Sequence, residues 1–167
     1  MQMSGLSVMN GWSTATAISS MRKKFFHTRT AWSRSCMFLD DTACNLSSVN
    51  LMKCRRPDGS FDVAAYAHIC RVMITAQEIV VGFSSYPTPA IEQNSYDYRP
   101  LGLGFAILGS VLMAMGLPYD SEEGRNLAAA FSSVMSGVAY EQSARIAERL
   151  GAFRGYAKNA EPMMRVM

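Results

Sequence analysis

Acidic residues are missing from the first part of this sequence. No Asp or Glu precedes Asp40, and over all 167 residues only 17% carry a charge. The net charge of +3 is too small to indicate a nucleic-acid-binding protein. Proline is scarce, with 6 residues, while 49% of the chain is hydrophobic, and this composition excludes a chain that is disordered throughout. The length suits one domain with a sizeable core, or a part of one.

Residues 1–36 differ in composition from the rest of the chain. They contain five Lys or Arg residues, no acidic residue and many Ser and Thr, and they lack the sustained apolar periodicity that would bury one face. Three interpretations stay open: an organellar transit peptide, a disordered tail, or sequence foreign to the downstream protein, such as an out-of-frame start. A secretory signal is disfavoured because no apolar stretch of the required length follows the basic residues.

The sequence also lacks the common metal and nucleotide motifs. Its four cysteines show no C-x-x-C spacing, and with two histidines they form no zinc-finger pattern, so we expect no metal site. No P-loop, nucleophile elbow or dinucleotide-binding fingerprint occurs. Cys70 falls in an apolar helical pattern, which predicts a buried thiol, and Gly102 and Gly104 predict close backbone packing. Without a signal peptide, reduced cytoplasmic thiols are the default, and these patterns leave the function open.

The middle of the chain predicts a strand, a turn and a helix in succession. Residues 43–51 alternate in the manner of a short strand, and residues 55–59 contain the Pro and Gly of a turn. Ser60 or Asp62 can then cap a helix that runs to about Gly82, because apolar residues recur at intervals of three and four. Residues 84–100 contain three prolines and little periodicity, which predicts a loop with one short helix at 90–95.

The second half begins with an uncharged run at residues 101–117. It is shorter than the ~20 residues that a bilayer span needs, so we expect a buried strand followed by a helix at about 105–115, with a small membrane protein as an open alternative. Asp120 and Glu123 then form a capping-box pattern before a helix that Gly151 ends. The residues expected to face inward on this helix are Leu127, Phe131, Val134, Val138 and Leu150. The whole pattern predicts an α/β fold that is mainly helical, with a few short strands.

Five segments have residue sequences that are more specific than a helix or strand pattern alone would require. They are FLDDTACNLSSVNLMK (38–53), FDV (61–63), YRPLGLGFAILG (98–109), MGLPYDSEEGR (115–125) and GAFRGYAKN (151–159). In this order they resemble the catalytic chain of adenosylcobalamin-dependent, class II ribonucleotide reductases. The resemblance runs from about residue 37 to residue 167 and corresponds to a middle portion of the family's much longer catalytic chain.

The resemblance implies a fold, a reaction and one catalytic residue. Residues 37–167 would form a portion of the family's ten-stranded α/β barrel, where adenosylcobalamin generates a cysteine thiyl radical that reduces ribonucleotides to deoxyribonucleotides for DNA synthesis. Cys44 matches one of the two cysteines that this reaction oxidises to a disulfide. By family, the activity is that of a cytoplasmic ribonucleoside-diphosphate reductase with a thioredoxin-like reductant as partner, and no nucleic-acid or membrane partner is implied; the residues themselves leave diphosphate and triphosphate substrates open.

The chain departs from the family just upstream of the first matching segment. The family carries Asn-x-Cys-x-Glu there, and the aligned residues here are Ala31, Ser33 and Ser35. Because a Ser O–H bond is too strong for reversible hydrogen-atom transfer, Ser33 cannot replace the radical cysteine. We therefore expect residues 1–36 to be out-of-frame or otherwise foreign, and residues 37–167 to be a partial barrel domain that is inactive alone.

An incomplete barrel would also affect stability and partners. Its strands and apolar helices would lack part of their neighbours, so we expect a marginal, aggregation-prone chain whose partner is the missing remainder of the reductase. The alternative from another functional class is a non-catalytic helical module for binding or assembly.

Overall fold

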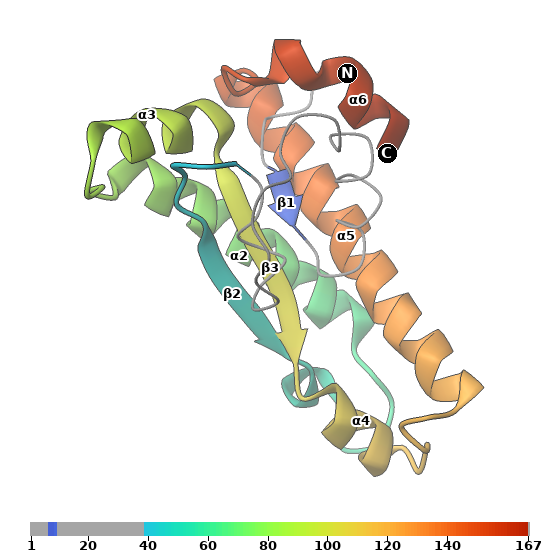
Figure 1. Cartoon of the computed structure of the whole chain (residues 1–167). Helices are drawn as coiled ribbons and strands as arrows, with labels where there is room; N and C mark the ends of the chain where they lie inside the picture. Colours follow the sequence, from blue (N-terminus) through green and yellow to red (C-terminus); the bar gives the residue numbers. More distant parts are fainter. Residues whose placement is uncertain (1–6, 10–38, 167) are drawn as a thin grey trace.

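A parallel sheet of three strands lies at the centre of the computed structural model, which describes residues 7–9 and 39–166. The strands β1 (Ser7–Met9), β2 (Asn45–Asn50) and β3 (Pro100–Ala106) lie in the order β1-β3-β2. A short 3-10 helix and two α-helices connect β2 to β3, which is the crossover that parallel neighbours require (Figure 1). β1 falls within the segment 1–36, and the other predictions for that segment lie outside the described residues.

The strand predicted in the middle of the chain is confirmed, and it ends in a short helical turn. Val49 on β2 is 5% exposed and belongs to the core. The Asn50 side chain accepts a hydrogen bond from the Met52 N–H (3.0 Å), and this cap starts the 3-10 helix η2 (Leu51–Cys54). The predicted turn follows, with Gly59 at a φ of +89°, a conformation in which a side chain would be strained.

The helix predicted after this turn is confirmed as α2 (Val63–Phe83). Of the two predicted caps the chain uses Asp62, whose Oδ1 accepts a hydrogen bond from the Ala65 N–H (2.8 Å). Buried positions then recur every three or four residues, as expected for a helix with one face on a core. These positions are Tyr66, Cys70, Ile74, Gln77 and Val81.

The short helix predicted at 90–95 is longer in the structure. α3 (Pro89–Tyr98) begins where the Thr88 hydroxyl accepts a hydrogen bond from the Ile91 N–H, with Pro89 at the first helical position that suits proline. It ends at Arg99, which adopts a left-handed conformation with a φ of 45°. The helix therefore leads directly into β3.

The uncharged run divides into a strand and a helix, as predicted, but the helix starts later than predicted. β3 continues to Ala106, and α4 (Leu108–Ala114) begins only after Ile107, whose φ of 70° interrupts the extended chain. Leu101 and Leu103 are fully buried on β3, so tertiary packing keeps this part extended. In the described part of the chain, none of the helices combines the length and the apolar character that a membrane span requires.

The long helix of the second half is confirmed as α5 (Glu122–Leu150), with two corrections. Its N-cap is Ser121, whose hydroxyl accepts a hydrogen bond from the Gly124 N–H (3.0 Å), and not Asp120. Leu150 is 78% exposed and does not face inward, because the helix extends past the sheet before Gly151 ends it. Phe131 is buried as predicted, while Leu127, Val134 and Val138 are partly buried against the core.

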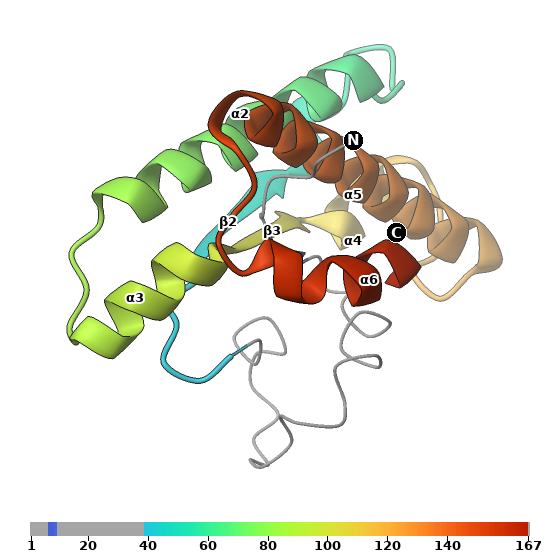
Figure 2. The same cartoon turned by 90° about the horizontal axis from the view of Figure 1, so that it is seen from above.

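The last helix, α6 (Tyr156–Val166), was not predicted from the sequence. The turn before it is attached to the end of α3, where the Gly155 N–H donates to the Asp97 carbonyl oxygen (2.9 Å). Arg154 and Asp97 form an ion pair at 3.5 Å. α3 and α6 consequently lie at the same end of the molecule (Figure 2).

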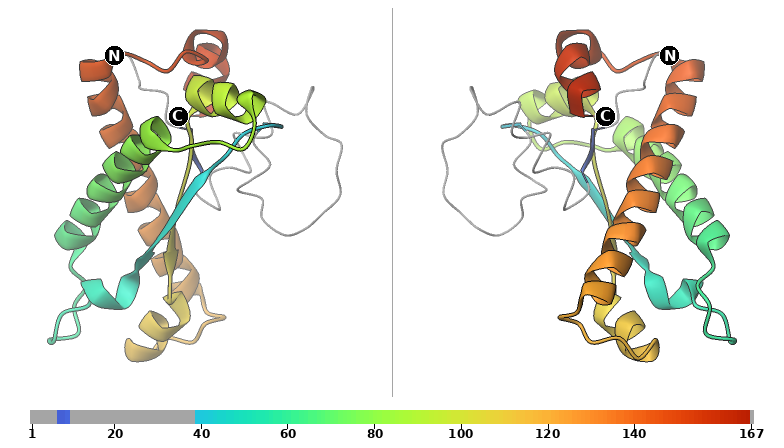
Figure 3. Two further views of the ribbon diagram at one scale, coloured as in Figure 1. Left: turned by 90° about the vertical axis from the view of Figure 1, so that its left-hand side faces the viewer. Right: turned by 90° about the vertical axis from the view of Figure 1, so that its right-hand side faces the viewer.

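Two layers result from this arrangement. α2 and α5 pack against each other and cover one face of the sheet (Figure 3). Phe61, Tyr66 and Phe131 meet edge-on or tilted in the core between the layers, with ring centroids 4.6 to 6.0 Å apart. The core residues are Val49, Leu51, Cys54, Tyr66, Cys70, Ile74, Val81, Leu101, Leu103, Val111, Phe131, Met135 and Ala139. The prediction of a mainly helical α/β fold is confirmed, and the sheet of the described residues is open, as part of a barrel would be.

Candidate functional site

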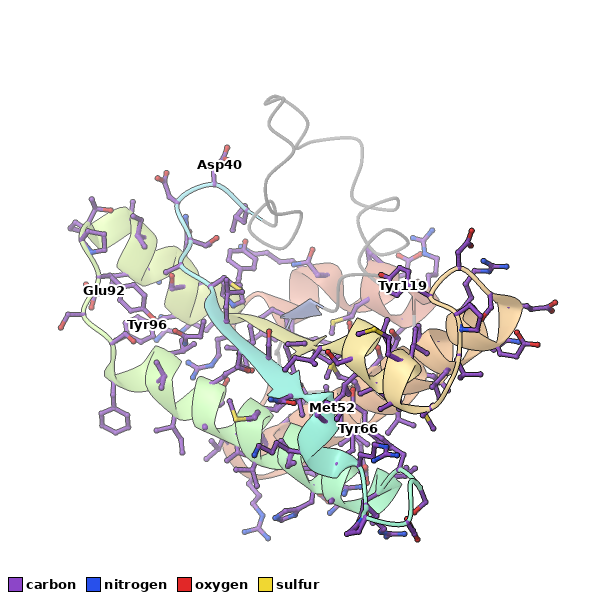
Figure 4. All side chains as sticks on the ribbon, turned by 90° about the horizontal axis from the view of Figure 1, so that it is seen from below. Asp40, Met52, Tyr66, Glu92, Tyr96 and Tyr119 are labelled. Carbon is purple, nitrogen blue, oxygen red and sulfur yellow. The ribbon has the colours of Figure 1, made fainter. Side chains whose placement is uncertain are left out.

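The sheet face opposite the core is the candidate functional surface. Because side chains alternate along a strand, Leu46 and Ser48 of β2 lie on this face, and both are exposed. Their parallel partners on β3 are Gly102 and Gly104, which have no side chains. In Figure 4, the labelled Asp40 and Met52 lie near the two ends of β2, and Tyr96 on α3 lies nearer the start of this strand. Among the described residues this face bears exposed side chains of β2, with the Leu46 side chain lying over Gly102.

Cys44 lies at the edge of this surface, immediately before β2. Its thiol is half-buried, and its Sγ lies 3.7 Å from the Asn45 carbonyl oxygen, to which it donates a hydrogen bond. A Cβ atom placed on Gly102 would lie 3.5 Å from this Sγ and would collide with the Leu46 side chain. The close backbone packing predicted at Gly102 is therefore present, and it leaves room for the Cys44 thiol.

Two buried polar side chains hold the residues on either side of Cys44. The Ala43 N–H donates to Ser95 Oγ of α3 (2.9 Å), and Ser95 is fully buried. Gln77 of α2, 4% exposed, donates from Nε2 to the carbonyl oxygens of Asn45 (3.0 Å) and Gly102 (2.7 Å). The Asn45 side chain returns a hydrogen bond from Nδ2 to the Gln77 backbone carbonyl (3.3 Å).

An ion pair lies next to this cluster in the chain. Arg99 Nε lies 2.5 Å from Glu78 Oε1, and Arg99 Nη2 donates to the Glu78 backbone carbonyl (2.9 Å). Only 13% of the Glu78 side chain is exposed. Burial raises the pKa of the Glu78 carboxyl group, and the neighbouring Arg99 opposes this effect. The pair connects α2 to the first residue before β3.

The other two described cysteines belong to the core. Cys70 is fully buried, as predicted, and Cys54 is 2% exposed. Burial raises the pKa of the Cys70 thiol to about 11 and also raises the pKa of Cys54. Because the thiolate is the reactive form, both thiols are poor nucleophiles at neutral pH. Cys44 therefore differs from them in lying beside the sheet face opposite the core.

The remaining residues of the predicted radical motif cannot be placed. Ala31, Ser33 and Ser35, the residues aligned with the family's Asn-x-Cys-x-Glu, lie outside the described residues. Within residues 7–9 and 39–166, no three His, Cys, Asp or Glu side chains come together in a way that could hold a metal ion.

The sequence patterns missed Gln77 and Ser95. A signal for Gln77 was present, because it stands where the three-and-four spacing of Ile74 and Val81 requires a buried residue. A polar residue at such a position needs a buried partner. Ser95 had no comparable signal, since residues 84–100 showed little periodicity.

Comparison with known proteins gives a family match over most of the chain. The family model described as ribonucleotide reductase, barrel domain, matches residues 18–167. A vitamin B12-dependent ribonucleotide reductase of Rhodopirellula baltica is 51% identical over 131 residues, which is 78% of this chain and 13% of the relative. One of Bradyrhizobium diazoefficiens is 47% identical over 163 residues, which is 95% of this chain and 12% of the relative.

A third relative has a more specific name. A vitamin B12-dependent ribonucleoside-diphosphate reductase of Mycobacterium tuberculosis is 34% identical over 114 residues, which is 68% of this chain and 16% of the relative. The chain thus matches a small part of each of these relatives. The match to the family model begins inside the segment 1–36, and the boundary near residue 37 stays a prediction. With 150 consecutive residues, 18 to 167, matched by the family model, the chain belongs to the ribonucleotide reductase barrel-domain family.

Proposed function

We propose that this chain is part of the catalytic barrel of a vitamin B12-dependent ribonucleotide reductase, and that Cys44 is one of its two reducing cysteines. The observation that carries the proposal is the position of Cys44 at the edge of the sheet face opposite the core, beside Gly102 and with its thiol only half-buried. A ligand on that face could reach this thiol, whereas Cys54 and Cys70 are buried in the core. The names of the relatives support the same reaction class.

In the reaction assigned to Cys44, the atoms and electrons balance between two cysteine thiols and the ribonucleotide. Two cysteine thiols lose two hydrogen atoms in total and become a disulfide. The ribonucleotide loses its 2′ hydroxyl as water, the C2′–O bond breaks and a C2′–H bond forms. A disulfide needs Cα atoms about 5.5–6 Å apart, so a backbone held rigidly at Cys44 suits this role. The family resemblance assigns the second cysteine to an earlier part of the catalytic chain.

The cofactor and partners are proposed for the whole reductase. Adenosylcobalamin supplies the initial radical when it is bound to the whole reductase. The substrate is a ribonucleotide, and the name of the M. tuberculosis relative favours a diphosphate. A thioredoxin-like protein would reduce the disulfide, and such a cycle requires the reducing conditions of the cytoplasm.

The role of Cys44 is tested by substitution in a full reductase that contains this chain with the family's radical-site residues restored (Ala31→Asn, Ser33→Cys and Ser35→Glu), because Ser33 cannot carry the radical. We expect Cys44→Ser to reduce deoxyribonucleotide formation to background when adenosylcobalamin and a thioredoxin-like reductant are supplied. Cys70→Ser is the control, because Cys70 lies in the core and would affect the enzyme only through stability. The measurement is turnover of a ribonucleoside diphosphate. Equal and measurable turnover in the restored reductase with and without Cys44→Ser would overturn the proposal.

One observation favours a second function from another class. Ala31, Ser33 and Ser35 replace the three radical-site residues of the family, so this chain as written lacks the thiyl cysteine. A non-catalytic helical module for binding or assembly would tolerate these replacements. Stable capture of a partner protein without nucleotide binding would favour that module.

A further inference from the structure

Buried polar side chains are rare in the core of this protein, and two of them contact the residues that flank Cys44. The buried polar residues of the described chain are Gln77, Ser95 and Ser143. Gln77 bonds to the residue after Cys44, and Ser95 bonds to the residue before it. A buried polar side chain costs free energy unless it is hydrogen-bonded, so the groups to which Gln77 and Ser95 bond indicate what these side chains do.

The hydrogen bonds of Gln77 satisfy only one end of its carboxamide group. Its Nε2 bridges the two neighbouring strands by donating to the carbonyl oxygens of Asn45 on β2 and Gly102 on β3. Its Oε1, however, is buried and has no hydrogen-bond partner within the described part of the chain. An apolar side chain at this position of α2 would avoid that unsatisfied acceptor. The carboxamide is thus better explained by what its Nε2 holds than by stability alone.

The two carbonyl groups held by Gln77 lie next to the Cys44 thiol. The Asn45 carbonyl oxygen also accepts the weak hydrogen bond from Cys44 Sγ. Gly102 is the residue over which this Sγ lies, because a Cβ there would come within 3.5 Å of it. Ser95 holds the residue before Cys44, because its hydroxyl oxygen accepts a hydrogen bond from the Ala43 N–H. Ala43 precedes β2, so no hydrogen bonds of the sheet hold its backbone.

We propose that Gln77 and Ser95 are positioning residues that hold the backbone on both sides of Cys44 and so set where its thiol lies on the sheet face opposite the core. The proposal rests on the proposed redox role of Cys44 for its purpose. A thiol that must meet a second cysteine and a substrate needs a fixed backbone, because disulfide formation tolerates little variation in distance. Neither residue needs to touch the substrate.

The test measures the reactivity of individual thiols in the complete 167-residue chain. Iodoacetamide labels the folded protein, and mass spectrometry of peptides gives a separate rate constant for Cys44, Cys54 and Cys70. The two core thiols serve as internal references, because their labelling requires the core to open. The variants are Gln77→Met, which keeps the length of the side chain, and Ser95→Ala, which removes one oxygen atom. Ile74→Val, on the same face of α2, is the control that weakens packing without removing a hydrogen bond.

We expect each variant to raise the labelling rate of Cys44 relative to that of Cys54 by about two- to tenfold, the range that the loss of one ordinary hydrogen bond allows. Ile74→Val should leave this ratio unchanged. A purely structural role would raise the rates of all three thiols together, and that result, or an unchanged Cys44 rate, would overturn the proposal. If Gln77→Met does not fold, Ser95→Ala decides, because it removes only one atom from the core.

The outcome can be separated from that of the reductase assay. Labelling requires neither substrate nor cofactor, so a changed ratio supports positioning even if Cys44→Ser retains turnover. In that case the redox role fails while the positioning role stands. If the labelling ratio is unchanged and the Cys44→Ser protein is inactive, the redox role of Cys44 stands and the positioning role of Gln77 and Ser95 fails.

Discussion

Glu78 and Arg99 form a largely buried ion pair that joins α2 to the start of β3. Arg99→Met removes one partner and leaves the Glu78 carboxylate without its countercharge, which is the costly way to break such a pair. We expect a loss of about 2 kcal/mol in the free energy of unfolding at pH 7, since both side chains keep some contact with water. Urea denaturation measures this loss. Arg145→Met, in an exposed ion pair with Glu141, is the matched control and should have little effect.

The cost of Arg99→Met should depend on pH in a defined direction. Burial already raises the pKa of the Glu78 carboxyl group, and without Arg99 the pKa rises further. The folded variant then binds a proton more tightly than the unfolded chain, so the penalty is present at pH 7 and decreases as the pH falls through the raised pKa. The difference in stability between wild type and variant should therefore be smaller near pH 5 than at pH 7. A difference that grows on acidification would contradict this account.

Individual residues were predicted from the sequence only where the local pattern decided their environment. Cys70 and Phe131 occupy regular apolar positions and are buried as expected. Leu150 occupies an equally regular position and is exposed, because α5 extends beyond the layer that would cover it. Gln77 reached the core despite its polarity because two strand carbonyls lie within reach of its side chain.

At the scale of elements, the two glycines of α5 provide a matched pair. A Cβ on Gly124 would lie 2.9 Å from the Pro118 carbonyl oxygen and 3.2 Å from that of Tyr119, both backbone atoms that cannot move aside easily. Nothing lies within 4 Å of a Cβ on Gly137. We expect Gly137→Ala to stabilise the protein by about 0.5–1 kcal/mol, because Ala is the better helix former. Gly124→Ala should destabilise it by about 1–3 kcal/mol through overpacking.

Thermal unfolding of both variants checks this expectation. The two substitutions are chemically identical and lie in one helix, so their difference isolates the close approach of the turn that precedes α5. Stabilisation by both would mean that the contacts around Gly124 relax without cost.

The elements that local signals define were predicted best. α2 and α5 carry periodic apolar faces and clear ends, and both were expected within a few residues of their bounds. The boundary between β3 and α4 was placed too early, because Leu101 and Leu103 stay in the sheet through burial that periodicity cannot reveal. α6 was not predicted, although Ala157, Ala160 and Met164 recur along it at helical spacing; Pro162 inside the helix weakens that local signal, and tertiary contacts join the start of α6 to α3.

For the whole molecule, the open sheet predicts how the isolated chain behaves. Parallel sheets are usually covered on both faces, but here Leu46 is 60% exposed on the face that α2 and α5 do not cover, within the part of the chain that the structure describes. We expect the chain alone to be marginally stable and to associate as its concentration rises. Sedimentation velocity and calorimetry test this. A soluble monomer with a cooperative transition at high temperature would contradict the expectation.

The reading frame of residues 1–36 is a second question at this scale. We propose that only a part of this segment is out of frame, because the family's radical-site motif is replaced at residues 31–35, whereas the alignment with the B. diazoefficiens relative covers 95% of the chain and so includes most of residues 1–36. Sequencing codons 1–45 and the region upstream in all frames should reveal codons for Asn-x-Cys-x-Glu in another frame. Their absence from every frame would exclude the proposal. Because the family model matches from residue 18, the sequencing should also locate the codon at which any change of frame occurs.

The sequence by itself determined the fold class and most helices and strands, because these depend on local periodicity and caps. It also determined the family to which Cys44 owes its proposed role, because family membership depends on specific sequence motifs. Only the tertiary structure decided that Cys44 lies over Gly102 and that Gln77 and Ser95 hold its two neighbours. These contacts join residues 25 to 52 positions apart in the chain. No local pattern encodes such contacts, because they form only when helices and strands pack together and a buried polar group must find its partner.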